Sequence, residues 1–88
     1  MSKIEAAIDR IKILECPTGE LENRVSGILE DYGIADKDKI RIDRAKILDS
    51  DDAQAYKVKI PDEGQAFVVM AQSGMDDYVA RVVDVYQK

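Results

Sequence analysis

Residues 56–60 alternate apolar and basic side chains with a period of two, the pattern of a strand with one buried and one solvated face. Tyr56, Val58 and Ile60 are therefore expected to point into a core. The loop that follows, at residues 61–64, begins with proline and ends with glycine, which predicts a short hairpin turn. This segment constrains the chain to an antiparallel sheet.

A second strand is predicted over residues 65–72, in a register that places Val58 opposite Phe67 and Tyr56 opposite Val69. Inward side chains then meet inward side chains across the hairpin. The register is therefore consistent with a single buried face.

A third strand is predicted upstream, joined to this hairpin by the acidic turn at residues 49–52. Counting residues across that turn places Ile47 on the inner face of the sheet. A one-residue β-bulge near Asp43 or Arg44 is then needed to bring Ile42 beside Val58, and a frayed or helical segment is the alternative. The prediction is a three-stranded meander with one bulge.

Three helices are predicted from apolar residues repeated at helical spacing. The first spans residues 3–15, and the second runs from an N-cap at Thr18 to a C-cap at Gly33. The third covers residues 75–86, after capping-box spacing at residues 73–76. The expected fold class is α+β, a two-layer sandwich with the meander packed by helices in the order α-α-β-β-β-α.

The first helix has an alternative, because residues 8–16 recur as residues 42–50 with six of nine positions identical. The second copy falls in a predicted strand. If both copies share one conformation, residues 10–15 form an N-terminal strand and the order becomes β-α-β-β-β-α. In either order, residues 1–88 are expected to form a single small domain.

The balance of charge favours some partners over others. The chain has 13 basic and 18 acidic residues, a net charge of −5, and the expected third helix begins with Asp76 and Asp77. Both features argue against nucleic acid, because phosphate binding requires clustered Lys and Arg. No apolar run is long enough for a membrane span, and a single cysteine cannot form an intrachain disulfide. These features predict a cytoplasmic protein with no membrane partner.

The sequence contains no motif that predicts a catalytic, cofactor-binding or metal site. Histidine, the commonest general base, is absent. The acidic turn at residues 49–52 lacks the oxygen ligand, glycine and glutamate that a calcium loop needs at its fifth, sixth and twelfth positions. Cys16 precedes a predicted helix, where a thiolate would be stabilised, but it has no histidine or second cysteine as a partner. Cys16 is expected to be structural, and a thiol-dependent small enzyme is the alternative.

The face of the predicted sheet away from the second and third helices is the best candidate for an interaction surface. It carries three basic and three apolar residues, namely Arg41, Lys57, Lys59, Ala66, Val68 and Met70. An edge strand that exposed Val68 and Met70 would promote aggregation, so these side chains are expected to be covered. The favoured cover is the N-terminal segment of the same chain. The alternative is a homodimer mate or an acidic partner protein.

These observations predict a small, non-enzymatic protein-interaction or regulatory module that needs no cofactor. Nucleic-acid binding through Arg41, Lys57 and Lys59 is the alternative function.

Overall fold

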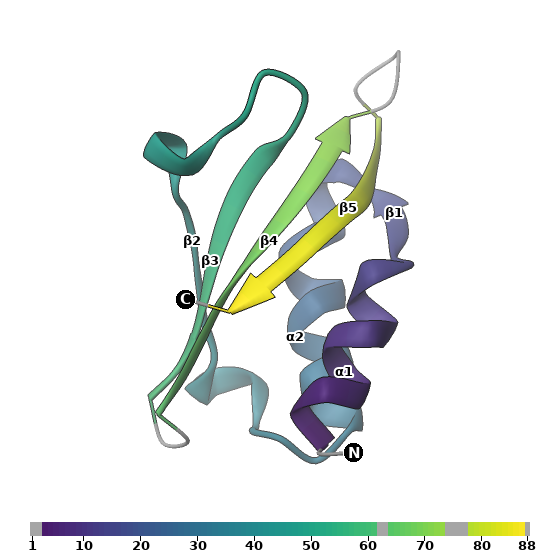
Figure 1. Ribbon diagram of the computed structural model, residues 1–88. Coiled ribbons are helices and arrows are strands. Elements are labelled where there is room, and N and C mark those ends of the chain that lie inside the picture. Colours follow the sequence, from purple (N-terminus) through teal and green to yellow (C-terminus); the bar gives the residue numbers. More distant parts are fainter. Residues whose placement is uncertain (1–2, 62–63, 74–77, 88) are drawn as a thin grey trace.

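The computed structural model describes residues 3–61, 64–73 and 78–87. Within these ranges the chain forms two α-helices and five strands, namely α1 (Lys3–Lys12), β1 (Glu15–Pro17), α2 (Leu21–Asp31), β2 (Arg41–Arg44), β3 (Gln54–Ile60), β4 (Gln65–Ser73) and β5 (Val79–Gln87). The strands pair antiparallel in the order β1-β5-β4-β3-β2. Both helices lie on the same side of this curled sheet (Figure 1). The α+β class is confirmed, but the sheet has five strands instead of three.

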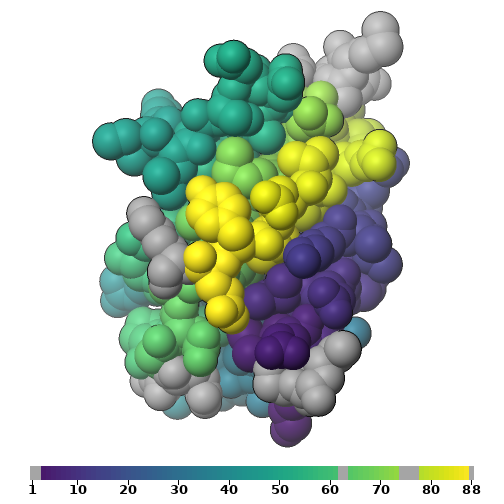
Figure 2. All heavy atoms as spheres, in the orientation of Figure 1, coloured from purple at the N-terminus to yellow at the C-terminus, as the bar shows by residue number. Residues whose placement is uncertain are grey.

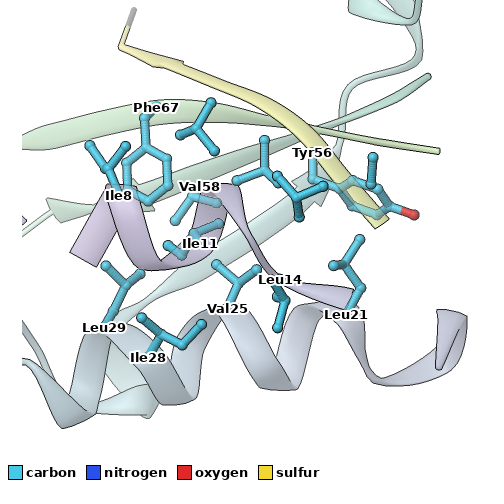
Figure 3. Packing of buried hydrophobic residues seen from close by; sticks show 14 of the residues in the cluster. Ile8, Ile11, Leu14, Leu21, Val25, Ile28, Leu29, Tyr56, Val58 and Phe67 are labelled. Carbon is cyan, nitrogen blue, oxygen red and sulfur yellow. The ribbon is translucent and has the colours of Figure 1, made fainter. Parts of the chain in front are cut away.

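The core lies between the two helices and the face of the sheet that they cover, which we call the inner face. In Figure 3, Phe67 and Val58 point from the sheet towards Ile8 and Ile11 of α1, and α2 closes the cluster with residues such as Leu29. All five side chains are buried. Burying an aliphatic or aromatic side chain of this size contributes about 1.5 to 3 kcal/mol, so this cluster is the main source of stability.

The hairpin of β3 and β4 forms as predicted. Val58 pairs with Phe67 and Tyr56 pairs with Val69. Gly64 has a φ of 63°, and its N–H donates to the carbonyl of Pro61 at 3.1 Å, which closes the turn. Glycine is needed there because a side chain disfavours this left-handed conformation.

The pairing of Ile42 with Val58 is also confirmed, but the predicted β-bulge and the inward position of Ile47 are wrong. Ile47 is 94% exposed and lies in a 3₁₀ turn, Lys46–Leu48. The turn absorbs the extra residue that the bulge was expected to hold. Strand pairing stops here because the carboxylate of Asp49 accepts the N–H of Ala55 at 2.7 Å, in place of a backbone carbonyl.

The N-terminal segment combines elements of the two predicted orders. Helix α1 covers most of the predicted helix but ends at Lys12, and the strand predicted over residues 10–15 is wrong. The strand that does form is β1, which pairs with β5 through Cys16 and Ala80. Helix α2 has Glu20 and not Thr18 at its N-cap position, and Tyr32 and not Gly33 at its C-cap position. Gly33 follows the C-cap directly, with a φ of 72°.

The predicted third helix is wrong, because β5 occupies most of its length. Strand β5 carries a register shift that leaves Val83 without a partner between Val82 and Asp84. The inward residues are therefore Ala80, Val82 and Val85, and the period of two changes to a step of three at the bulge. The helix was predicted from the spacing of Val79, Val82, Val83 and Tyr86, and of these four only Val82 is buried. The predicted helix start at residues 74–77 lies outside the described residues.

Candidate interaction surface

The side of the sheet that the helices leave open, which we call the outer face, brings the predicted surface residues together. Two rows of side chains cross it from strand to strand. One row joins Arg41, Lys59 and Ala66, and the other joins Lys57, Val68 and Tyr86. Val68 and Met70 form an apolar strip on this face. The other four predicted residues are exposed or half-buried, namely Arg41, Lys57, Lys59 and Ala66.

The pair of Arg41 and Lys59 is unusual because two exposed cations lie directly opposite each other on neighbouring strands. Like charges in such cross-strand pairs are destabilising. Lys57, two residues along β3, has the same outward direction and lies opposite Asp43. The chain as a whole has a net charge of −5, so this basic group stands out from the rest of the protein. It is suited to an anionic or acidic partner.

The apolar strip of the outer face is not exposed. Val68 and Met70 are only 0% and 8% exposed, and they form a second apolar cluster with Ala53 and Ala55. Leu48 packs against this cluster from the segment at residues 45–53, which we call the strap. The cover is therefore intramolecular, as favoured, but the prediction that the N-terminal segment supplies it is wrong. Helix α1 packs instead on the inner face.

The strap is held by one network of polar contacts. The two terminal nitrogens of the Arg44 guanidinium, Nη1 and Nη2, donate to the two carboxylate oxygens of Asp49, at 2.7 and 2.9 Å. Arg44 also donates to the carbonyl of Ala55 at 2.9 Å, and its guanidinium lies 5.2 Å from the centre of the Tyr56 ring. The hydrogen bonds from Arg44 and from the N–H of Ala55 lower the pKa of Asp49 to about 2. Bidentate pairs of this kind fix geometry as well as charge.

The exposed large apolar side chains of the described strands all lie on β5, where the sequence did not predict them. Val79, Val83 and Tyr86, which we call the β5 patch, are 38%, 45% and 38% exposed. Tyr86 lies opposite Val68, which places it on the outer face, and the bulge turns Val83 away from the core. Figure 2 shows the atoms of β5, in yellow, along the surface between α1 and the teal segment that contains the strap.

The β5 patch was missed because its residues were assigned to a helix. In that helix Val79, Val83 and Tyr86 shared a buried stripe, whereas in the strand they point outward. The one signal in the sequence that favours a strand is composition: residues 79–86 contain four valines and a tyrosine, which are common in strands.

Cys16 lies in β1 with its side chain in the main core cluster. Burial raises the pKa of its thiol, with a smaller opposing effect from Arg24. A nucleophilic cysteine needs the opposite shift, because only the thiolate reacts. The geometry therefore supports the structural interpretation of Cys16 over the reactive one.

The acidic turn borders an open hollow of about 350 Å³, which is also lined by Gln54, Ala71 and Ser73. Within the ranges that the structure describes, there is no group of three or more His, Cys, Asp or Glu side chains that could hold a metal ion. Asp49, the first residue of this turn, is already engaged by Arg44 and Ala55.

No known protein family, curated protein or solved structure matches this chain. None of the described helices is long and apolar enough to cross a membrane.

Proposed function

We propose that this chain is a non-enzymatic protein-interaction module that binds an acidic partner protein through the outer face of its sheet. The observation that carries the proposal is the β5 patch, in which three large apolar side chains are each more than a third exposed on one strand. A half-exposed tyrosine is a common contact residue in interfaces, because it buries a large area with little loss of conformational entropy.

The charge around the patch indicates the kind of partner. Tyr86 lies in the same cross-strand row as Lys57, and Lys59 and Arg41 continue the basic group towards the far edge of the sheet. An apolar contact with cations farther along the same face of the sheet favours a partner with apolar side chains and carboxylates. We place this activity in the cytoplasm, which agrees with the single, unpaired cysteine.

A photo-crosslinking amino acid placed at position 86 tests the proposal. Tyr32 provides a matched control, because it is 37% exposed, almost the same as Tyr86, and lies at the end of α2 instead of on the sheet. We expect an acidic protein from host extract to be captured from position 86 and not from position 32. Reversing both Lys57 and Lys59 to glutamate should abolish the capture.

Equal capture from both positions, or capture that survives the double reversal, would refute the proposal. A titration with labelled single-stranded and duplex RNA and DNA tests the nucleic-acid alternative. Tight binding that weakens steeply with added salt and is lost in the Lys57→Glu, Lys59→Glu variant would replace the protein partner with nucleic acid.

A further inference from the structure

The outer edge of β2 is the starting point, because β2 is the last strand of the sheet and no described strand pairs with its far side. The direction of its backbone groups follows from one hydrogen bond. The N–H of Ala45 donates to the carbonyl of Ala55 across the β2–β3 ladder. In an antiparallel ladder, the backbone groups of successive residues point alternately towards the partner strand and away from it. The backbone groups of Asp43 and Arg41 therefore point towards β3, while those of Ile42 and the N–H of Arg44 point outward. The edge can therefore accept another strand.

We infer that the β2 edge pairs with the β2 edge of a second copy of this chain, with Ile42 opposite Ile42 across a two-fold axis. In this register Arg41 of each copy lies opposite Asp43 of the other, on the outer face. Each outer-face row then reads Lys59, Arg41, Asp43 and Lys57, with the last two residues from the second copy. The like-charged pair of Arg41 and Lys59 gains a carboxylate neighbour, and opposite charges in such rows are stabilising.

Other two-fold registers do not give this complementarity. The outward backbone groups belong to Ile42 and Arg44, so these residues must pair with each other or with themselves. A register centred on Asp43 would place this carboxylate opposite itself, and one centred on Arg44 would place two guanidinium groups opposite each other and Asp43 opposite Ala45. Only the register centred on Ile42 brings opposite charges together at both ends, as an isologous interface requires.

On the inner side of the edge, a hollow of about 290 Å³ lies between α2 and β2, lined by Glu22, Asn23, Ser26, Lys37, Ile40 and Ile42. Ile40 and Ile42 are partly buried and pack against the main core cluster. In the dimer, the Ile42 side chain of the second copy would lie beside Ile42 at the rim of this hollow. The dimer would join two five-stranded sheets into one continuous sheet.

This inference goes beyond the proposed function, because three strands separate β2 from β1 at the other edge and the β5 patch is not part of the contact. Short, charged edge strands often serve to prevent pairing, and that is the competing explanation. The two explanations differ in one respect. Charges that only prevent pairing need not be complementary to those of a second copy, whereas in this register each Arg41 faces an Asp43.

Sedimentation velocity of the intact chain, from about 1 µM to about 1 mM, tests for the dimer. The contact is smaller than a standard interface, so a dimer fraction that grows across this range is expected. Arg41→Asp places Asp opposite Asp43 of the second copy, and Asp43→Arg places Arg opposite Arg41. Each variant alone should therefore be monomeric. Both positions are exposed, so circular dichroism should show that both variants stay folded.

An equimolar mixture of the two variants gives the decisive result. Aspartates at positions 41 and 43 of one variant then face arginines at both positions of the other, so the mixture should dimerise although neither variant does alone. Lys12→Asp, a reversal on α1 away from this edge, should dimerise like the natural chain. A natural chain that stays monomeric at about 1 mM, or a mixture that stays monomeric, would overturn the inference. Dimerisation unaffected by either single variant would also overturn it, because the interface would then lie elsewhere.

Discussion

Truncation of Leu48 tests whether the strap stabilises the fold by covering the outer apolar cluster. Leu48 packs on this cluster, whereas its neighbour Ile47 is 94% exposed, so the two positions form a matched pair. Leucine to alanine removes three carbon atoms, which contribute about 2.4 kcal/mol when fully buried, at about 0.8 kcal/mol each. Leu48 is partly buried, so Leu48→Ala is expected to lower the free energy of unfolding by about 1 to 2 kcal/mol.

The loss of cover has a second consequence. Val68 and Met70 are almost fully buried, and removing the leucine exposes part of their surface to water. An apolar dye should therefore bind to Leu48→Ala more strongly than to the natural chain. Ile47→Ala should change neither dye binding nor stability by more than about 0.5 kcal/mol, as expected for an exposed side chain.

Urea denaturation followed by circular dichroism measures both variants, and thermal unfolding provides an independent check. A change of 1 kcal/mol shifts the midpoint of a domain of this size by about 4 to 8 °C, so Leu48→Ala should melt about 4 to 16 °C lower. Equal effects of the two truncations, or a larger effect of Ile47→Ala, would refute the assignment of the strap as the cover of Val68 and Met70.

Three further predictions follow from individual residues. Gly27→Ala should stabilise the chain by about 0.5 to 1 kcal/mol, because an added Cβ in the middle of α2 meets only ordinary contacts. Gly33→Ala should destabilise it by about 1 to 2 kcal/mol, because Gly33 has a φ of 72°. Urea midpoints of the two variants that fail to move in opposite directions would contradict this prediction. The pKa of Asp49 is lowered from 3.8 to about 2 in the folded chain, so its charge stabilises the fold above about pH 4 and that contribution is lost as the pH falls towards 2. The melting temperature of Asp49→Asn should therefore lie below that of the natural chain at pH 6, and the difference should shrink as the pH falls from about 4 through 2. A constant difference across this range would argue against the ion pair of Asp49 with Arg44. Cys16→Ser should cost about 1 to 2 kcal/mol in urea and leave partner capture intact, and the thiol of the folded natural chain should react with a disulfide reagent only as fast as the chain unfolds.

Much of the candidate surface could be predicted because it depends on one hairpin. The register of β3 and β4 follows from local alternation and from the turn, and it places Lys57, Lys59 and Ala66 on the outer face without any knowledge of the helices. Arg41 joins them because Ile42 must face the core. What covers Val68 could not be predicted, because the strap reaches it through a turn whose shape depends on hydrogen bonds of Arg44 and Asp49 to Ala55 on the neighbouring strand.

The β5 patch could not be predicted for a different reason. A bulge is decided by the neighbouring strand, since only the register against β4 shows that Val83 has no partner. Without that strand, the spacing of Val79, Val82, Val83 and Tyr86 fits a helix as well as it fits an interrupted strand. Val82 is buried in both interpretations, whereas Val79, Val83 and Tyr86 are buried in the helix and exposed in the strand.

The repeated segment separates what the sequence determines from what the tertiary structure decides. Residues 8–16 and 42–50 share six of nine positions, yet the first copy ends α1 and enters β1, while the second forms β2 and a 3₁₀ turn. Local sequence determines the β3–β4 hairpin, because its alternation and its turn residues favour the same structure. In the repeated segment, no such local signal decides between helix and strand. Ile8 and Ile11 are buried where a helix packs on the inner face. Ile42 instead lies beside β3, whose backbone groups on that side would have no partner in the sheet without β2, so a strand forms there and satisfies them.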